Sequence, residues 1–201
     1  MHPLIFRHAG YAIAFWLAGT VWGATELFIN SPKASEPGAD RRDQGSRWVV
    51  VGTMFVGIFA GSLLANAVLQ ATINWQRPAL VIAGIVLVLA GVALRQWAVH
   101  TLGRYFTMDV ATRADQPVIQ NGPYRFVRHP SYSGVLVSAL GLGLALTNWL
   151  ALVVMLAMVW AGLAYRVRIE ERALREALGT PYVAYASRTP RFIPWPLPHR
   201  G

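Results

Sequence analysis

The chain has no cysteine, and it has little charge for a length of 201 residues. Without cysteine it cannot form a disulfide, a thiolate nucleophile or a cysteine-ligated metal site. Charged residues make up 13% of the sequence, about half of their share in soluble domains. Hydrophobic residues make up 55%, so the composition favours a membrane protein, and the length favours a single structural domain.

The charge that is present is mostly positive, with a formal net charge of +9. A basic chain can bind nucleic acid, but basic residues in so apolar a sequence more often orient loops and contact anionic lipid. We therefore expect membrane lipid as a partner and no nucleic acid.

Five hydrophobic segments predict an all-α integral membrane protein with about five transmembrane helices. The first, at about 9–29, exceeds a signal-peptide core and lacks an A-x-A cleavage site, so we expect a retained helix. The next two are expected at about 48–70 and 79–100. Gly57 and Gly61 in the second have the spacing of close helix packing, Pro78 opens the third, and Arg95 near its end is expected to snorkel to the interface.

The last two segments are predicted to form a helical hairpin. No formal charge occurs in the 37 residues between Arg128 and Arg166. As one helix they would reach about 55 Å, against a hydrocarbon core of about 30 Å. We expect a break at Thr147-Asn148 and two helices of about fifteen residues. The hairpin would bring the polar clusters on either side of it to one membrane face.

Charge asymmetry predicts the orientation. With five segments, 16 of the 18 basic residues fall on the side of the C-terminus, which the positive-inside rule makes cytoplasmic, with the N-terminus outside. The membrane would be the cell inner membrane or its equivalent. A cytoplasmic helix is expected after the last segment, ending at Gly179, and the prolines from Pro181 onward predict an irregular tail.

Two groups of residues could carry chemistry, and each has a plainer alternative. Glu170 shares a helix face with Val167 and Leu174, although Glu171 could simply pair with Arg175 at i, i+4. Arg128-His129-Pro130 could likewise be a helix start with an arginine on lipid phosphate. His129 has no second ligand at metal spacing nearby, so we expect no metal.

Read together, the motifs resemble the isoprenylcysteine carboxyl methyltransferase family and its wider relatives among phospholipid methyltransferases. The resemblance covers roughly the last hundred residues, so we treat 1–100 as N-terminal membrane helices and 101–201 as a methyltransferase core. Its strength is in the order and spacing of the motifs, which are Leu102-Gly-Arg-Tyr-Phe-Thr107, Gly122-Pro-Tyr-Arg125, Arg128-His-Pro-Ser-Tyr-Ser-Gly134, Glu170-Glu171 and Gly179-x-x-Tyr182.

The resemblance implies a membrane enzyme that uses S-adenosylmethionine without a Rossmann fold, and no G-x-G-x-x-G motif is present. It implies that Arg166 contacts the methyl acceptor, one helical turn from Glu170. The residues implied for the cofactor are Gln116, Pro117, Val118, Ile119, Tyr124, His129, Pro130, Ser131, Tyr132, Glu170 and Glu171.

The expected acceptor is a lipophilic small molecule or a lipidated protein, methylated on a carboxylate as in isoprenylcysteine. A carboxylate is ionised at neutral pH and needs an orienting cation, whereas an amine must first lose a proton. N-methylation of a phospholipid or small amine is therefore the second hypothesis. A nicotinamide-dependent membrane reductase and a non-catalytic scaffold remain as further alternatives.

Overall fold

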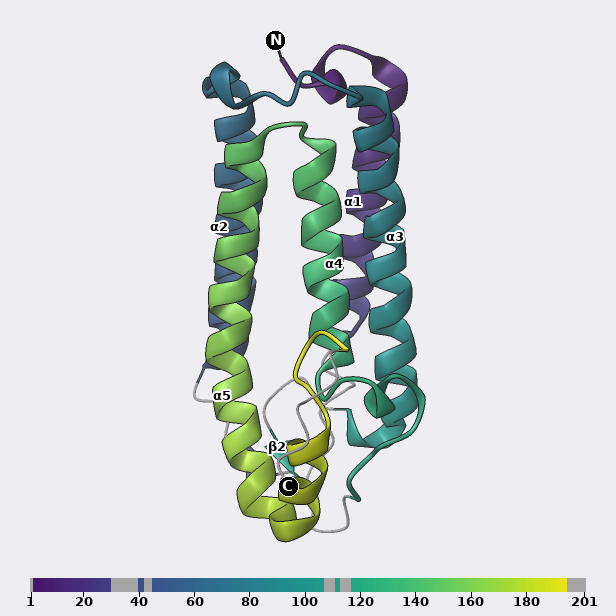
Figure 1. Ribbon diagram of the computed structural model, residues 1–201, viewed down its shortest axis with the longest axis vertical. Helices are drawn as coiled ribbons and strands as arrows, with labels where there is room; N and C mark the ends of the chain where they lie inside the picture. The colour runs from purple at the N-terminus through teal and green to yellow at the C-terminus, as the bar shows by residue number, and fades with distance from the viewer. Residues whose placement is uncertain (1, 30–39, 42–44, 107–110, 113–116, 195–201) are drawn as a thin grey trace.

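The computed structural model describes residues 2–29, 40–41, 45–106, 111–112 and 117–194, and its architecture is all-α, as predicted (Figure 1). One two-residue antiparallel pair joins β1 (Asp40–Arg41) to β2 (Ala111–Thr112). The helical elements are η1 (Leu4–Phe6), α1 (Ala9–Ile29), α2 (Ser46–Ala67), η3 (Leu69–Ala71), α3 (Arg77–Leu102), η4 (Gly103–Tyr105), η5 (Gly122–Arg125), α4 (Pro130–Ala145) and α5 (Trp149–Arg188).

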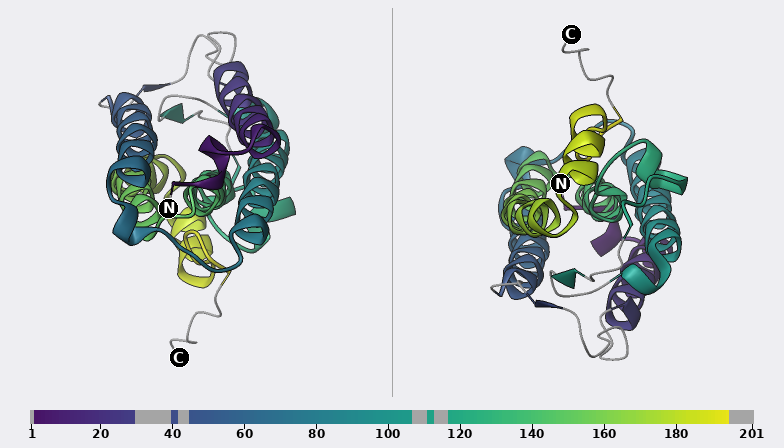
Figure 2. Two further views of the ribbon diagram at one scale, coloured as in Figure 1. Left: turned by 90° about the horizontal axis from the view of Figure 1, so that it is seen from above. Right: turned by 90° about the horizontal axis from the view of Figure 1, so that it is seen from below.

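The five long helices run alternately up and down, and they pack as two pairs with α1 added at one side (Figures 1 and 2). The most extensive contacts are those of α3 with α4 and of α2 with α5, while α1 lies against α3. The start of α2, the ends of α1 and α3, the start of α4 and the last part of α5 all lie at the lower end in Figure 1, which we call the polar end.

The structure agrees with the prediction of an integral membrane protein. Within the described residues, three helical segments are long and apolar enough to cross a membrane: Ser46–Ala67, Arg77–Tyr105 and Trp149–Arg188. Helix α4 is also apolar but has only 16 residues. All five expected hydrophobic segments are helices, and five complete crossings stay a prediction.

Glycines allow α3 and α4 to approach almost backbone to backbone. A Cβ atom added to Gly141 would lie 2.5 Å from the carbonyl oxygen of Gly84, and one added to Gly134 would lie 2.6 Å from that of Gly91. Both distances are shorter than real Cβ contacts. The two glycines on each helix are seven residues apart, so they share one face of two antiparallel helices, as close packing in a membrane requires.

The predicted break between α4 and α5 is confirmed. Thr147 has a φ angle of 49°, and the side chain of Asn148 accepts a hydrogen bond of 3.0 Å from the backbone N–H of Ala151, which caps α5. The backbone N–H of Ile73 also donates to the carbonyl of Thr147, at 2.8 Å. The two turns at this end are therefore bonded to each other.

Two expectations for the last segment are wrong. Helix α5 is not a fifteen-residue helix followed by a separate one, because it continues from Trp149 into the polar end without a break until Gly179. Gly179 does interrupt the helix, with φ 58° and ψ −140°, but helical structure resumes and ends at Arg188. Pro181 is tolerated because it lies in the first turn after the interruption, where its missing N–H has no intrahelical partner to lose.

The close packing of Gly141 against α3 predicts that a larger residue at this position lowers the stability of the protein. Gly141→Ala places a methyl group into the backbone of α3, so we expect a loss of about 1–3 kcal/mol of stability, the usual range for overpacking. Thermal unfolding in detergent measures the change. Gly19→Ala is the matched control, because nothing lies within 4 Å of a Cβ at that position of α1. Equal unfolding temperatures for the two variants would contradict the close contact.

Candidate active site

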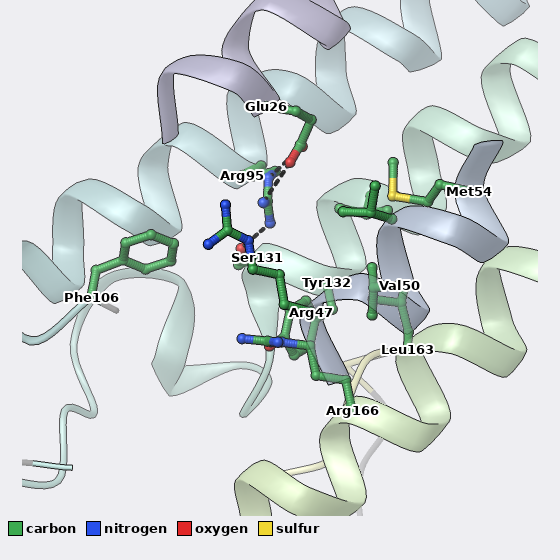
Figure 3. A pocket seen from close by; sticks show the side chains of 12 residues that line it. Glu26, Arg47, Val50, Met54, Arg95, Phe106, Ser131, Tyr132, Leu163 and Arg166 are labelled. Atoms are coloured by element: carbon green, nitrogen blue, oxygen red, sulfur yellow. Dashed lines mark hydrogen bonds and ion pairs between the residues drawn. The ribbon is translucent and has the colours of Figure 1, made fainter. Parts of the chain in front are cut away.

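A pocket, which we call the cavity, lies among all five long helices at the polar end, with about 520 Å³ of empty space when the part open to solvent is included (Figure 3). Its apolar wall comes mainly from α2, with valine and methionine side chains, and from α4 and α5. Its polar wall holds three arginines, one glutamate, one serine and one tyrosine. The lining residues are Glu26, Arg47, Val50, Val51, Met54, Arg95, Phe106, Ser131, Tyr132, Val135, Leu163 and Arg166.

Tyr132 connects the two sides of the hairpin at this cavity. Its hydroxyl donates to Glu170 Oε2 at 2.7 Å and accepts from Arg166 Nε at 2.7 Å. Arg166 also donates to Ser46 Oγ at 3.1 Å. The structure thus brings together three of the predicted site residues, with Arg166 and Tyr132 on the cavity and Glu170 behind the tyrosine hydroxyl.

Arg95 does not snorkel to the interface. Its side chain is buried, and it pairs with Glu26 Oε2 at 2.7 Å and donates to Ser131 Oγ at 2.6 Å. The expectation was wrong because the acidic partner, Glu26, comes from α1, almost seventy residues earlier. No local pattern in the sequence links Glu26 to Arg95. Sequence reasoning therefore missed both Glu26 and Arg95 as parts of the site, although a lone acid at the end of a hydrophobic helix was a usable signal.

Glu171, rather than Glu170, is the buried carboxylate of the pair. Its Oε1 lies 2.8 Å from Arg128 Nη2 and 3.3 Å from His129 Nε2, and its Oε2 lies 2.9 Å from Arg191 Nη2. The expected i, i+4 contact with Arg175 is also present, at 3.3 Å. The hydrogen bonds to Glu171 raise the pKa of Arg191 above its usual value. Both oxygens of Glu171 are thus used in holding segments of the chain together.

The chain after α5 folds back along the start of α4, and we call its described residues, 189–194, the strap. The carbonyls of Pro190 and Arg191 accept hydrogen bonds from the backbone N–H groups of Arg128 and His129, at 2.8 and 3.0 Å. Phe192 then packs against the ring of His129, with centroids 6.0 Å apart. This segment covers His129, which is buried and stacks on Tyr132 at 5.6 Å.

The other residues predicted to bind the cofactor differ in how far they are buried. Pro130 begins α4, as expected. Tyr124 is buried, accepts a 2.6 Å hydrogen bond from Tyr185 at its carbonyl, and has a pKa raised well above its usual value, first by burial and then by the charge of Glu170. Pro117 is exposed and Val118 and Ile119 are half-buried, so their contact with a cofactor stays a prediction. Gln116 lies outside the described residues.

One buried polar atom near the carboxylates lacks a partner. The Tyr182 hydroxyl makes no hydrogen bond within the described part of the chain, although the side chain is only 3% exposed. It lies close enough to Glu170 and Glu171 to interact with their charges. A buried hydroxyl without a partner is costly, so this position suits a polar ligand at the inner side of the strap.

The arrangement can orient two ligands on either side of Tyr132. The Glu170 side offers a partly exposed carboxylate, stacked aromatic rings and the Tyr182 hydroxyl, a set that suits a ligand with amino, hydroxyl and aromatic groups. The Arg166 side offers cations beside an apolar wall. The described residues contain no group of three metal-ligating His, Asp or Glu side chains.

Comparison with known proteins agrees with this geometry. The model of the isoprenylcysteine carboxyl methyltransferase (ICMT) family matches residues 83–176. The resemblance to the ICMT family is confirmed. The matched segment runs from the second turn of α3 to Glu176 and holds Arg95, Tyr132, Arg166 and Glu170, whereas α1 and α2 lie outside it.

Individual relatives show how far the likeness extends. Protein-S-isoprenylcysteine O-methyltransferase B of Arabidopsis thaliana is 34% identical over 114 residues, 56% of this chain and 58% of that protein. The cobalt-zinc-cadmium resistance protein CzcN of Cupriavidus metallidurans is also 34% identical, over 77% of this chain and 65% of that protein. The chain therefore spans about half to three fifths of the length of the first curated ICMT relatives.

A solved structure supports the fold. The eukaryotic intramembrane Ras methyltransferase ICMT, solved without a monobody, superposes with a TM-score of 0.54 at 24% identity. The superposition covers 76% of this chain and 53% of that one. The ICMT fold thus extends beyond residues 83–176 in this chain.

The buried pair of Arg95 and Glu26 predicts a marked loss of stability when one charge is removed. We expect Glu26→Gln to cost about 3–5 kcal/mol, because Arg95 is left as a buried cation without its acid. Thermal unfolding in detergent measures this. The double variant Glu26→Gln with Arg95→Met removes both charges and should recover much of the loss. A single variant that unfolds at the wild-type temperature would show that the pair does not stabilise the fold.

Proposed function

We propose that this protein is an S-adenosylmethionine-dependent membrane methyltransferase that methylates a carboxylate on a lipophilic, isoprenylcysteine-like acceptor. The observation that carries the proposal is the position of Tyr132, whose hydroxyl bonds to Glu170 on one side and to Arg166 on the other. A polar site and a cationic, apolar-walled cavity thus meet at one side chain. Membership of residues 83–176 in the ICMT family supports methyl transfer as the reaction.

The cofactor would be held on the Glu170 side. Glu170 would accept hydrogen bonds from the hydroxyl or amino groups of the cofactor, and the buried Tyr182 hydroxyl would donate a hydrogen bond to the cofactor. The stacked rings of His129 and Tyr132 would pack beside it. When bound, S-adenosylmethionine supplies a methyl group that is already activated by the sulfonium. The protein therefore needs to supply position and the exclusion of water, and positioning alone can contribute about 7–11 kcal/mol.

The acceptor would be held in the cavity, with its carboxylate toward Arg166. The fixed position of Arg166 follows from its bonds to Tyr132 and Ser46, so little side-chain freedom is lost when it binds an anion. The valines and Met54 of the α2 wall would contact the lipid chain. A guanidinium pairs with a carboxylate through two parallel hydrogen bonds, which fixes the orientation of the acceptor as well as its position.

Carboxyl O-methylation fits the cavity better than N-methylation. The cavity wall has three arginines and a single glutamate, which is already paired with Arg95. An amine acceptor arrives as a cation and needs a base to take its proton, and the positive charge of the three arginines disfavours its approach. Phospholipid or small-amine N-methylation is therefore the second candidate.

The polar end would face the cytoplasm. The basic residues gather on the side of the C-terminus, 16 of 18 by the sequence, and the positive-inside rule assigns that side to the cytoplasm. The methyl donor would then arrive from the cytoplasm and a lipophilic acceptor from the membrane. The inner membrane of the cell, or its equivalent, is the expected location.

Calorimetric titration of S-adenosylmethionine into the detergent-purified protein tests the cofactor side. We expect saturable binding by the wild type and binding at least about tenfold weaker for Glu170→Ala, because a hydrogen bond to a charged group contributes about 1.5–3 kcal/mol. Glu176→Ala removes an exposed carboxylate from the same helix and should bind as the wild type does. A folded wild-type protein that does not bind the cofactor would overturn the proposal and favour a reductase or a scaffold.

A further inference from the structure

Three arginines line the cavity at the polar end, and a large part of its remaining wall is apolar. The side chains of Arg47, Arg95 and Arg166 reach it from α2, α3 and α5 (Figure 3). Among the described lining residues, Glu26 is the single acid, and it is bonded to Arg95 at 2.7 Å. The described lining residues therefore carry three formal positive charges and one negative charge, a balance that suits an anionic ligand.

The first turn of α2 adds to this positive field. Helix α2 begins at Ser46 and has no acidic residue in its first turn, so the partial positive charge of its N-terminus is not offset there. Ser46 is fully buried and accepts the 3.1 Å hydrogen bond from Arg166 Nη1. Arg47, the next residue, is thus anchored beside Arg166 on the same cavity.

The rest of the cavity suits the body of an amphiphile. Val50, Val51 and Met54 follow Arg47 along α2 and line the cavity, facing Val135 of α4 and Leu163 of α5. A ligand with a negatively charged head and an apolar chain matches this order, with its head at the start of α2 and its chain along the helix. Burial of the chain would give affinity, and the guanidinium groups would orient the head.

We propose that Arg47 is a second acceptor-binding residue, which together with Arg166 holds the acceptor carboxylate and makes α2 the element that determines acceptor specificity. This inference rests on the proposed function. It concerns a part of the chain outside the segment 83–176 that matches the ICMT family. Selection of the acceptor would thus depend on α2 as well as on Arg166 of the family segment.

A pair of neutral and charged ligands tests the role of Arg47. The probes are an N-acetylated prenylcysteine with a free carboxylate and its carboxamide, and binding is measured by calorimetry. We expect the wild type to bind the acid at least about tenfold more tightly than the amide. Arg47→Gln should remove most of this preference and raise the KM for the acid, while affinity for S-adenosylmethionine stays within about twofold of wild type. Arg47→Lys keeps the charge and should restore part of the preference.

Arg168→Gln is the matched control, because Arg168 is exposed on α5 and does not line the cavity; it should behave as the wild type. Arg47→Gln with an unchanged preference for the acid would overturn the inference. So would a wild type that binds S-adenosylmethionine but binds acid and amide equally. A wild type that binds no S-adenosylmethionine and transfers no methyl group would instead contradict the proposed function itself.

Discussion

The close glycine contact between α3 and α4 is the constraint on which the polar end depends. A Cβ at Gly134 would lie 2.9 Å from the backbone nitrogen of Arg95, so the two backbones nearly touch just where the site begins. This approach places the Arg95 side chain against Ser131 in the first turn of α4 and toward Glu26 of α1. A wider separation of α3 and α4 would break the contact between Arg95 and Ser131 and move the first turn of α4 away from the rest of the site.

A second constraint is the carboxylate of Glu171, which holds three segments together. Arg128 and His129 from the start of α4 and Arg191 from the strap all pair with it. These ion pairs fix the strap over His129, whose ring stacks on Tyr132. The Tyr132 hydroxyl lies between Glu170 and Arg166 and is bonded to both. The two adjacent glutamates therefore differ in their surroundings: Glu171 is buried and joins segments of the chain, whereas Glu170 is partly exposed and, in our proposal, binds the cofactor.

Local patterns were enough to predict the helices, the hairpin break and the meeting of the two polar clusters. The individual site residues Tyr132, Arg166 and Glu170 came instead from the resemblance to a family. The 37 uncharged residues required a turn, and Thr147-Asn148 supplied it. Contacts between distant segments could not be predicted in this way. The pairing of Glu26 with Arg95 and the bond between Ser46 and Arg166 join helices far apart in sequence. Pro181 does not predict the helix after Gly179, because a proline that can end one helix is equally compatible with the first turn of the next.

The chemical nature of the transferred methyl group tests the central claim most directly. Purified protein would be incubated with S-adenosylmethionine labelled in its methyl group and a mixture of a prenylcysteine acid and phosphatidylethanolamine. A carboxyl methyl ester is cleaved by base to volatile methanol, whereas an N-methyl group is stable to base. We predict label that base releases and that is found on the acid. Base-stable label found on the amine alone would contradict carboxyl methylation at the arginine-lined cavity.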